Sequence, residues 1–191
     1  FVFIAYAAIG LIISTGAFNG LVAGLLKILK GKARAVIIPI FILVLGCISS
    51  TIGVFEEAFP FIPIFVGIAI AMGYDALVGL GIVALGVGLG YSVAVMNPFT
   101  VGMAQDIAGI PQMSGIGFRI ICHVVMIIVA STLLIRYALK VQADPTKSYV
   151  YGDDFSHMEM DPQGIEHHSF GIREKAVLAV LALGVVVIVW G

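Results

Sequence analysis

Apolar residues dominate the chain, and short polar or charged intervals divide them into separate hydrophobic stretches. Residues 1–26 are apolar apart from an interruption at 14–20. At 1.5 Å per residue they are long enough to cross a hydrocarbon core of about 30 Å. A short basic loop at 27–34 follows, and further apolar stretches lie at 35–73, 75–110, 117–138 and 174–191. This pattern predicts a series of membrane segments rather than a soluble core.

Residues 35–73 do not have the pattern of a simple spanning helix. Apolar runs at 35–48 and 58–73 flank the polar stretch 49–57, which reads SSTIGVFEE. Each run is shorter than the roughly 17 to 25 residues that a helix needs to span a bilayer. We therefore predict a re-entrant helical hairpin. Its polar tip is expected halfway through the bilayer, buried in protein or lining a solvated cavity.

The next segment, 75–110, is predicted to be a broken helix. Asp75 is suited to cap its first turn, and the glycines that follow, including the Gly86-x-x-x-Gly90 pair, favour close packing of helices in lipid. The helix should break at Asn97-Pro98, because proline has no amide hydrogen and restricts the preceding residue.

Basic residues predict the orientation. Residues 117–138 form a clean span that ends near Arg136 and Lys140, followed by a polar linker at 141–173 and the start of another transmembrane helix at 174–191. If the hairpin at 35–73 returns to the side of the membrane from which it entered, both basic regions lie on the same side. Two full membrane spans at 35–73 would place them on the same side as well. The positive-inside rule makes that side cytoplasmic, so loops 27–34 and 139–173 are expected in the cytoplasm of a multi-pass inner-membrane protein.

Composition supports the membrane class. The chain is 61% hydrophobic and 11% charged, and its mean hydropathy is +1.15, which predicts an all-α integral membrane protein. A net charge of −1 argues against nucleic acid as a partner. The chain starts without methionine and ends inside an apolar run, so we interpret it as a fragment of a longer protein.

Carboxylates are rare in the apolar region. Between Arg34 and Arg119 lie 84 residues without lysine or arginine, and two of the four carboxylates there are the adjacent pair Glu56 and Glu57. Neighbouring helical positions point about 100° apart, so at most one of the two readily faces a shared site. Because ionisable groups in membranes are costly, we predict that at least one is functional.

Two interrupted membrane segments in succession are typical of secondary transporters, in which half-helix ends and unwound carbonyls hold an ion or a substrate. No catalytic residue or cofactor is predicted beyond a coupling ion, Na⁺ or H⁺. Hydroxyl and carbonyl oxygens suit Na⁺, and Ser50, Thr51 and Asn97 are its candidate ligands. The full set of candidate substrate and ion ligands is Ser49, Ser50, Thr51, Gly53, Glu56, Glu57, Asn97, Pro98, Thr100, Gly102, Gln105 and Asp106.

Simpler roles remain open for these residues. Serine and threonine in membrane helices often bond the preceding turn, and Asn-Pro can be a plain kink. Arg119 is interpreted as a boundary anchor, and His123 either relays protons or bonds a neighbouring helix. The linker histidines, His157, His167 and His168, fit no defined metal spacing.

Two other classes compete with a transporter. An intramembrane aspartyl protease is suggested by Tyr74-Asp75 followed by Gly79-Leu-Gly81, but Ile82 stands where a second aspartate is needed. A passive channel could be lined by the same hairpin.

Ordered motifs carry a family resemblance. They are TIGVFEEAFP at 51–60, GYDALVG at 73–79, NPF at 97–99, GMAQ at 102–105 and AGIP at 108–111. From about residue 31 to 154 the chain resembles the YfcC-type branch of the anaerobic four-carbon dicarboxylate carrier family. The resemblance implies a dimeric elevator carrier of the ion transporter superfamily, built from two inverted repeats that each hold a re-entrant hairpin and a broken helix.

On this resemblance the chain is the first repeat plus the linker. Ser50, Thr51 and Gly53 would lie at the hairpin tip, and residues 97–102 at the facing break. Ala58 and Ala94-Val95 stand where hydroxyls are expected, which weakens the sodium assignment. The implied function is symport or antiport of a small organic ion, either a basic amino acid or a dicarboxylate, by alternating access. A homodimer in contact with lipid is expected, and the Glu56-Glu57 pair would suit a cationic substrate.

Overall fold

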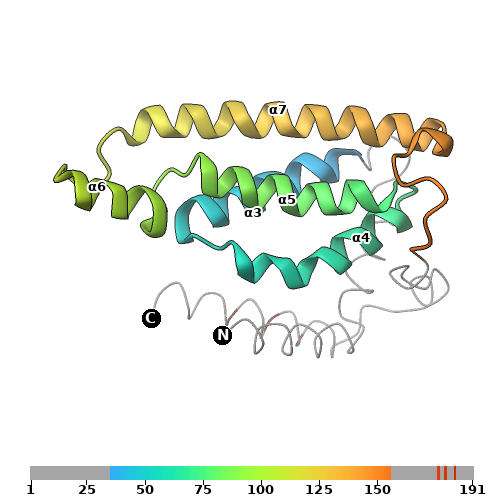
Figure 1. The fold of residues 1–191 in the computed structure, drawn as a ribbon, viewed down its shortest axis with the longest axis horizontal. Coiled ribbons are helices and arrows are strands. Elements are labelled where there is room, and N and C mark those ends of the chain that lie inside the picture. The colour runs from blue at the N-terminus through green and yellow to red at the C-terminus, as the bar shows by residue number, and fades with distance from the viewer. Residues whose placement is uncertain (1–34, 156–175, 177–178, 180–182, 184–191) are drawn as a thin grey trace.

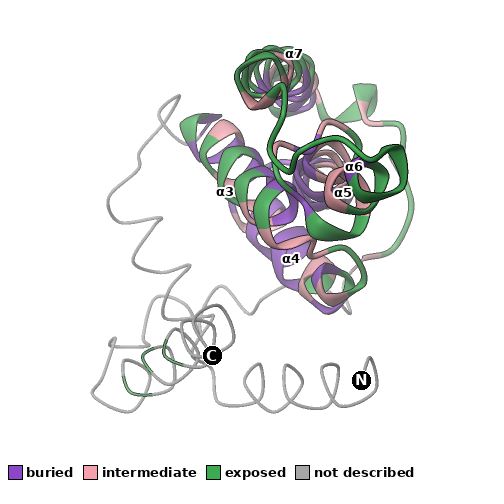
Figure 2. Ribbon diagram, turned by 90° about the vertical axis from the view of Figure 1, so that its left-hand side faces the viewer, coloured by how far each residue is buried: buried purple, intermediate pink, exposed green. Residues whose placement is uncertain are grey.

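The computed structural model describes residues 35–155 together with Ala176, Ala179 and Leu183. Within this part of the chain there are helices and turns and no β-strand. Three helices, α3, α5 and α7, lie side by side, with α7 on one side of the α3 and α5 pair and α4 on the other (Figures 1 and 2). The expectations for 1–26, 27–34, most of the linker, and all but three residues of 174–191 concern residues outside the described ranges.

The segment 35–73 folds as two helices that run in opposite directions (Figure 1). α3 spans Ile37–Ile52 and α4 spans Ile62–Ala71, joined through a 3₁₀ helix, η2, at Glu56–Phe61. α3 ends at Gly53, whose φ is +88° and whose N–H donates to the carbonyl of Ser49 at 3.1 Å. Glycine is required there because it adopts the left-handed conformation freely, and because a Cβ would meet the ring of Phe99 at 2.5 Å.

Helix α5, Ala76–Ser92, packs against both arms of this hairpin. Gly79 lies against the backbone of α4, where a Cβ would come 2.5 Å from the carbonyl oxygen of Phe65. On the other arm, Cβ atoms at Gly86 and Gly90 would meet α3, the latter 2.5 Å from the carbonyl oxygen of Gly46. The predicted packing role of these glycines is therefore confirmed, and it explains how α3, α4 and α5 approach so closely.

After α5 the chain breaks and resumes as a π-helical turn, η3, at Pro98–Gly102 and a short helix, α6, at Met103–Ala108. Helix α7 then runs from Ile116 to Ala143 and is the one described helix that is long and apolar enough to cross a membrane. A stripe of buried residues along α7 faces α3 and α5, while most of the rest of its surface is exposed (Figure 2). The stripe consists of His123, Ile127, Ala130, Ser131, Leu134, Ala138 and Val141.

The start of α3, the turn before α5 and the end of α7 lie at one end of the bundle (Figure 1). At that end Asp75 caps α5 as predicted, accepting a hydrogen bond from the N–H of Val78 at 3.0 Å. The other oxygen of the Asp75 carboxylate accepts hydrogen bonds from the hydroxyl groups of Tyr137 at 2.5 Å and Ser148 at 2.6 Å. Asp75 thus joins α5, α7 and the residues that follow α7.

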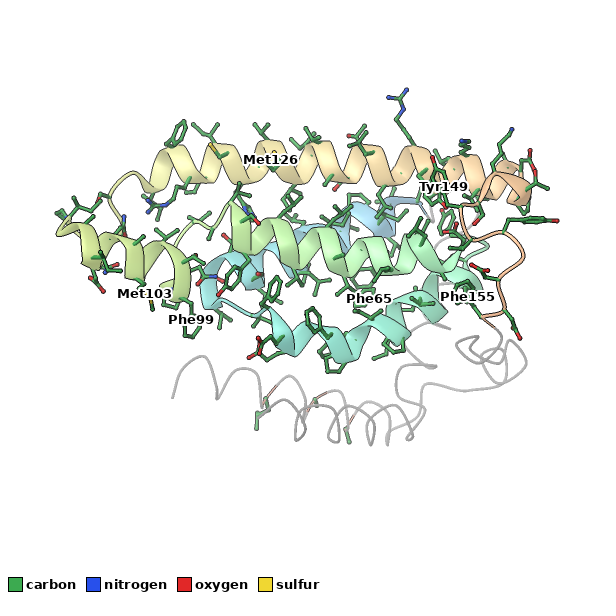
Figure 3. The ribbon with its side chains drawn as sticks, viewed as in Figure 1. Phe65, Phe99, Met103, Met126, Tyr149 and Phe155 are labelled. Carbon is green, nitrogen blue, oxygen red and sulfur yellow. The ribbon has the colours of Figure 1, made fainter. Side chains whose placement is uncertain are left out.

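The beginning of the linker, which the sequence marks only as polar, makes specific contacts with the bundle. The ring of Tyr149 stacks on the ring of Tyr137 with centroids 5.4 Å apart, and the N–H of Tyr149 donates to the Tyr137 hydroxyl at 3.2 Å. Tyr149 and Phe155 lie beside the end of α7 and the start of α5 (Figure 3). Residues 144–155 therefore fold back on the bundle, because Asp75 and Tyr137 offer them partners that composition does not reveal.

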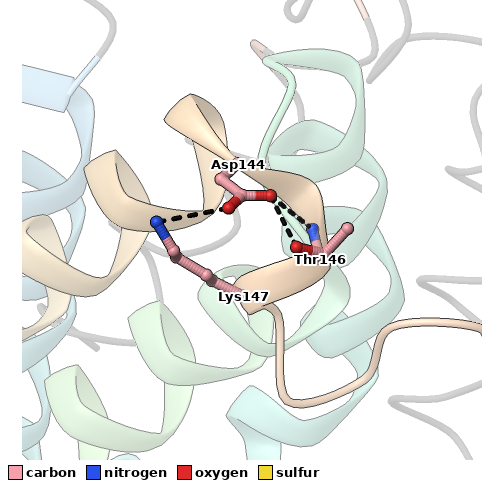
Figure 4. A network of polar contacts seen from close by, with 3 residues as sticks. All are labelled: Asp144, Thr146 and Lys147. Carbon is pink, nitrogen blue, oxygen red and sulfur yellow. Dashed lines mark hydrogen bonds and ion pairs between the residues drawn. The ribbon is translucent and has the colours of Figure 1, made fainter.

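The turn that starts this return is the short 3₁₀ helix η4, Pro145–Lys147. Asp144 accepts hydrogen bonds from the N–H and hydroxyl of Thr146, and its carboxylate lies 3.2 Å from Nζ of Lys147 (Figure 4). The hydrogen bond from the Thr146 side chain, followed by that from Lys147, lowers the pKa of the Asp144 carboxyl. A lowered pKa means that this contribution to stability is present above the unfolded-state pKa and is lost as the pH falls through the folded-state pKa.

Replacing Asp75 with alanine is expected to lower the stability of the full-length protein by about 2 kcal/mol, because it removes an N-cap and two further hydrogen bonds to a carboxylate. Thermal unfolding in detergent measures this, and limited proteolysis should show faster cleavage within residues 144–155. Asp75→Asn keeps an oxygen that can cap α5 and should lose less. Equal melting temperatures for wild type and Asp75→Ala would contradict the role of Asp75 as a link.

Candidate functional site

The end of α3 and the break after α5 are directly bonded to each other. The N–H of Val95 donates to the hydroxyl oxygen of Ser50 at 2.8 Å, and the N–H of Met96 donates to the carbonyl of Ser50 at 3.2 Å. The side-chain amide of Asn97 donates to the carbonyl of Ser49 at 3.1 Å. Ser49, Ser50 and Asn97 are all fully buried. The two interrupted segments predicted from the sequence therefore meet side by side.

Asn97 also prepares the turn that follows. Its side-chain oxygen accepts a hydrogen bond from the N–H of Phe99 at 2.8 Å, which caps the π turn. The same oxygen would lie 2.9 Å from a Cβ at Gly53. Asn97 thus uses its amide nitrogen on the hairpin and its amide oxygen on the break, and the absence of a side chain at Gly53 leaves room for it.

The other side of the break is held by α7. Nδ1 of His123 lies 3.1 Å from the carbonyl oxygen of Val93, and Nε of Arg119 donates to the carbonyl of Val95 at 2.9 Å. Because a carbonyl can only accept, Nδ1 of His123 carries the hydrogen in this contact. Arg119 and His123 are four residues apart, so they share one face of α7.

The non-helical backbone at 93–97 is therefore bonded from both sides: the amides of Val95 and Met96 donate to α3, and the carbonyls of Val93 and Val95 accept from α7. This arrangement lies level with the first two turns of α7, since Arg119 and His123 both follow closely on Ile116. The depth of the contact in a bilayer, expected at the midplane, stays a prediction.

The candidate sodium ligands do not all share one place. Ser50 and Asn97 belong to the buried contact between α3 and the break. Thr51 lies on an exposed part of α3, and its hydroxyl donates to the carbonyl of Cys47 at 2.7 Å, as the simpler interpretation of membrane threonines expects. The sodium site stays a prediction, with Thr51 turned toward its own helix.

Glu56 and Glu57 lie at the turn of the hairpin, at the start of η2. Glu56 is exposed, and Glu57 is half-buried with its carboxylate accepting a hydrogen bond from the N–H of Phe55 at 3.1 Å. Within the described ranges neither carboxylate has an ion-pair partner. Glu57 has a local partner in the turn, whereas Glu56 has a carboxylate available to a ligand or to another part of the protein.

The remaining candidates belong to the π turn, to α6 and to the loop after it. Gln105 is buried and bonds that loop through the N–H of Met113 at 3.0 Å and the carbonyl of Ser114 at 3.0 Å. Asp106 is exposed and accepts a hydrogen bond from the side chain of Gln112, which also donates to the carbonyl of Gly102. Gln105, Asp106 and Gly102 are thus drawn into a fold of this loop, and they do not reach Ser49 and Ser50 in these contacts. Pro98 and Thr100 lie in the π turn itself.

A cavity of about 530 Å³ lies on the α7 side of the break. It is lined by residues from the end of α5, from η3 and α6, and from α7: Tyr91, Ser92, Val93, Ala94, Thr100, Val101, Ala104, Arg119 and Cys122. Thr100 was the one candidate ligand among them. Arg119 lines this cavity, and its role as a boundary anchor stays a prediction. Its spacing of four from His123 was the available signal for a shared position on α7. Among the described residues, no group of three His, Cys, Asp or Glu could hold a metal ion.

Comparison with known proteins gives the family. The family model described as "C4-dicarboxylate anaerobic carrier" matches residues 1–191, the whole chain. The chain belongs to this family. Membership in the C4-dicarboxylate anaerobic carrier family confirms the resemblance inferred from the motifs, and it assigns the chain to a membrane.

Two curated relatives of this family member are similar over its full length. The chain is 33% identical to an uncharacterised protein of Haemophilus influenzae, of which it covers 38%, and 28% identical to an Escherichia coli protein titled "Putative basic amino acid antiporter YfcC", of which it covers 37%. The chain thus spans less than two fifths of the length of these relatives. No solved structure matches it.

Proposed function

We propose that the chain is the first repeat of a secondary active carrier, which moves a small organic ion across the cytoplasmic membrane by alternating access. The observation that supports this most is the break at 93–97, whose backbone is held between α3 and α7. Irregular backbone inside a membrane protein is tolerated where protein or a cavity satisfies it. In secondary transporters such breaks hold the substrate or the coupling ion.

The contacts around the break are suited to rearrangement. Few hydrogen bonds join α3 to the break, and each typically contributes only about 0.5–1.5 kcal/mol net. Binding of an ion or substrate could therefore exchange these bonds for others at small cost. The coupling ion is Na⁺ or H⁺ in this proposal, with Ser50 and Asn97 as the oxygen ligands closest to the break.

The acidic pair gives the proposal its charged group. Glu56 is the carboxylate that we assign to a cationic part of the substrate, because Glu57 already supports the hairpin turn. A relative is titled as a basic amino acid antiporter, which agrees with an acidic ligand, while the family description names dicarboxylates. The rival aspartyl protease is disfavoured, since the carboxylate of Asp75 serves as a helix cap and a link to α7.

Uptake by the full-length protein in proteoliposomes tests the proposal, with arginine, ornithine and succinate as substrates and with or without a sodium gradient. We expect saturable uptake of at least one substrate. Glu56→Gln should lower it at least tenfold, because the charge is lost. Glu57→Gln should lose less, because glutamine can still accept the hydrogen bond from Phe55.

Asp153→Asn is the matched control, since it removes a carboxylate at an exposed position at the other end of the bundle. It should transport like the wild type. Normal uptake in both Glu56→Gln and Glu57→Gln would remove the acidic pair from the mechanism. Conductance without saturation or exchange would replace the carrier with a passive channel.

The proposed assembly is a multi-pass homodimer in the inner membrane. The outward surface of α7 carries many exposed apolar side chains, among them Phe118, Ile121, Val125, Ile128 and Leu133. Such a surface suits contact with lipid or with further protein.

A further inference from the structure

The cavity on the α7 side of the break is lined by a cationic side chain for which residues 35–155 supply no anionic partner. Arg119 is half-buried, and its guanidinium donates to two neutral carbonyls, that of Val95 through Nε and that of Ser114 through Nη1 at 2.6 Å. Its third nitrogen, Nη2, is buried and has no hydrogen-bond partner within the described part of the chain. A buried donor left unpaired costs about 1–3 kcal/mol, and more when it belongs to a charged group.

A second unpaired polar atom belongs to a residue that lines the same cavity. The hydroxyl oxygen of Thr100 is buried and has no hydrogen-bond partner in the described residues, and Thr100 lines the cavity together with Arg119. The other lining side chains are mostly apolar, and none of them is acidic. The cavity of about 530 Å³ falls within the range of small-molecule sites, roughly 300–1,000 Å³, which combine apolar walls with a few polar groups.

We propose that Arg119 and Thr100 form a carboxylate-binding site in this cavity, with Nη2 of Arg119 and the Thr100 hydroxyl as its donors. A guanidinium suits a carboxylate because its N–H groups form a planar fork. The carbonyls of Val95 and Ser114 fix the guanidinium in place, so little side-chain freedom is lost on binding. One fixed positive charge matches one carboxylate group, and both an amino acid and a dicarboxylate carry at least one.

This site adds detail to the proposed function. The identification of its ligand with the transported ion rests on that proposed function. The site also couples the ligand to the break, because Arg119 bonds the carbonyl of Val95 while the N–H of Val95 bonds Ser50 on α3. A carboxylate bound to Arg119 therefore lies one residue away from the contact between α3 and the break.

The test is equilibrium binding to the full-length protein in detergent, measured by calorimetry and by the shift in melting temperature. Two matched pairs of probes isolate the carboxylate: arginine against its decarboxylated analogue agmatine, and succinate against succinamide. We expect at least one carboxylate probe to bind and its partner without the carboxylate to bind at least tenfold more weakly. Equal binding within both pairs, or no binding by any probe, would overturn the site.

Variants locate the binding. Arg119→Gln should weaken binding of the carboxylate probe at least tenfold, whereas Arg136→Gln, an exposed arginine on the same helix, should leave it unchanged. Thr100→Val guards against misfolding, because it removes a hydroxyl that bonds nothing in the described structure. Thr100→Val should bind the probe several-fold more weakly than the wild type. Its melting temperature without ligand should be no lower than that of the wild type. A purely structural role of Thr100 predicts instead that binding and melting temperature fall together.

Transport and binding can fail separately. Uptake that is unaffected by Arg119→Gln would overturn the site and leave the carrier function standing. Carboxylate-dependent binding that Arg119→Gln abolishes, in a protein that shows no uptake, would support the site and overturn the carrier function.

Discussion

Replacing Gly79 with alanine should destabilise the protein more than any other single methyl addition on α5. The new Cβ would lie 2.5 Å from the carbonyl oxygen of Phe65 and 2.6 Å from the nitrogen of Val66, and it would also press on the Cα of Val66. All three atoms belong to the backbone of α4, so no side-chain rotation can relieve the overlap. Overpacking of this kind costs about 1–3 kcal/mol and occasionally more, and we expect a value at or above the upper end.

Gly88→Ala is the matched control for Gly79→Ala. Gly88 lies on the same helix, and a Cβ there would meet nothing within 4 Å. Thermal unfolding of the full-length protein in detergent, followed by size-exclusion chromatography, should show a much lower melting temperature for Gly79→Ala and none of that loss for Gly88→Ala. Similar melting temperatures for the two variants would show that α4 and α5 do not pack as described.

These glycines show how far the sequence could predict the fold. The structure has a helical hairpin, the cap at Asp75 and a break before Pro98, which follow from local chemistry. The helix ends at Ser92, earlier than the predicted break at Asn97-Pro98, and the re-entrance of the hairpin stays a prediction. The glycine spacing predicted close packing of α5 in general. Gly79 and Gly88 look equivalent in the sequence, however, and only the arrangement of α4 relative to α5 separates a close contact from open space.

The direction in which each polar side chain points was also beyond the sequence. α3 is apolar up to Ile48 and then has three hydroxyl residues in a row, so its pattern does not reveal which face is buried. Ser50 therefore could not be told apart from Thr51, although the first bonds the break and the second bonds its own helix. Arg119 was interpreted from its position near the start of a span. Its partner, the carbonyl of Val95, is 24 residues earlier in the chain, and no local pattern records such a contact.

The same limit explains the linker. The sequence marks residues 141–173 only as a polar linker, and composition alone does not show which polar residues have a specific partner. The Ser148 hydroxyl donates a hydrogen bond to Asp75, which is 73 residues earlier in the chain. The N–H of Tyr149 donates to the hydroxyl of Tyr137 on α7. The structure adds most to the interpretation from sequence at Arg119 and at the start of the linker. In both cases the contact joins residues that are distant in the chain.

Asn97→Asp should lower substrate uptake in proteoliposomes at least tenfold. Asn97 is fully buried and donates from its amide nitrogen to the carbonyl of Ser49. An ionised aspartate would place a second acceptor against that carbonyl and would bury a charge. The oxygen that caps Phe99 is retained, so the variant removes the side-chain bond from Asn97 to α3 while keeping the turn and the two backbone bonds to Ser50. A loss of about 1.4 kcal/mol corresponds to a factor of ten, and an unpaired buried group costs about 1–3 kcal/mol.

Gln142→Glu makes the same exchange of an amide for a carboxylate at an exposed position on the last turn of α7, and it should transport normally. Ser50→Ala offers a second route that adds no charge, since it only deprives the N–H of Val95 of its acceptor, and we expect a smaller loss of uptake. Melting temperatures measured on the same preparations separate a local effect from misfolding. Wild-type uptake in both Asn97→Asp and Ser50→Ala would mean that the bonded contact between α3 and the break takes no part in transport, because its two principal side chains would then be dispensable.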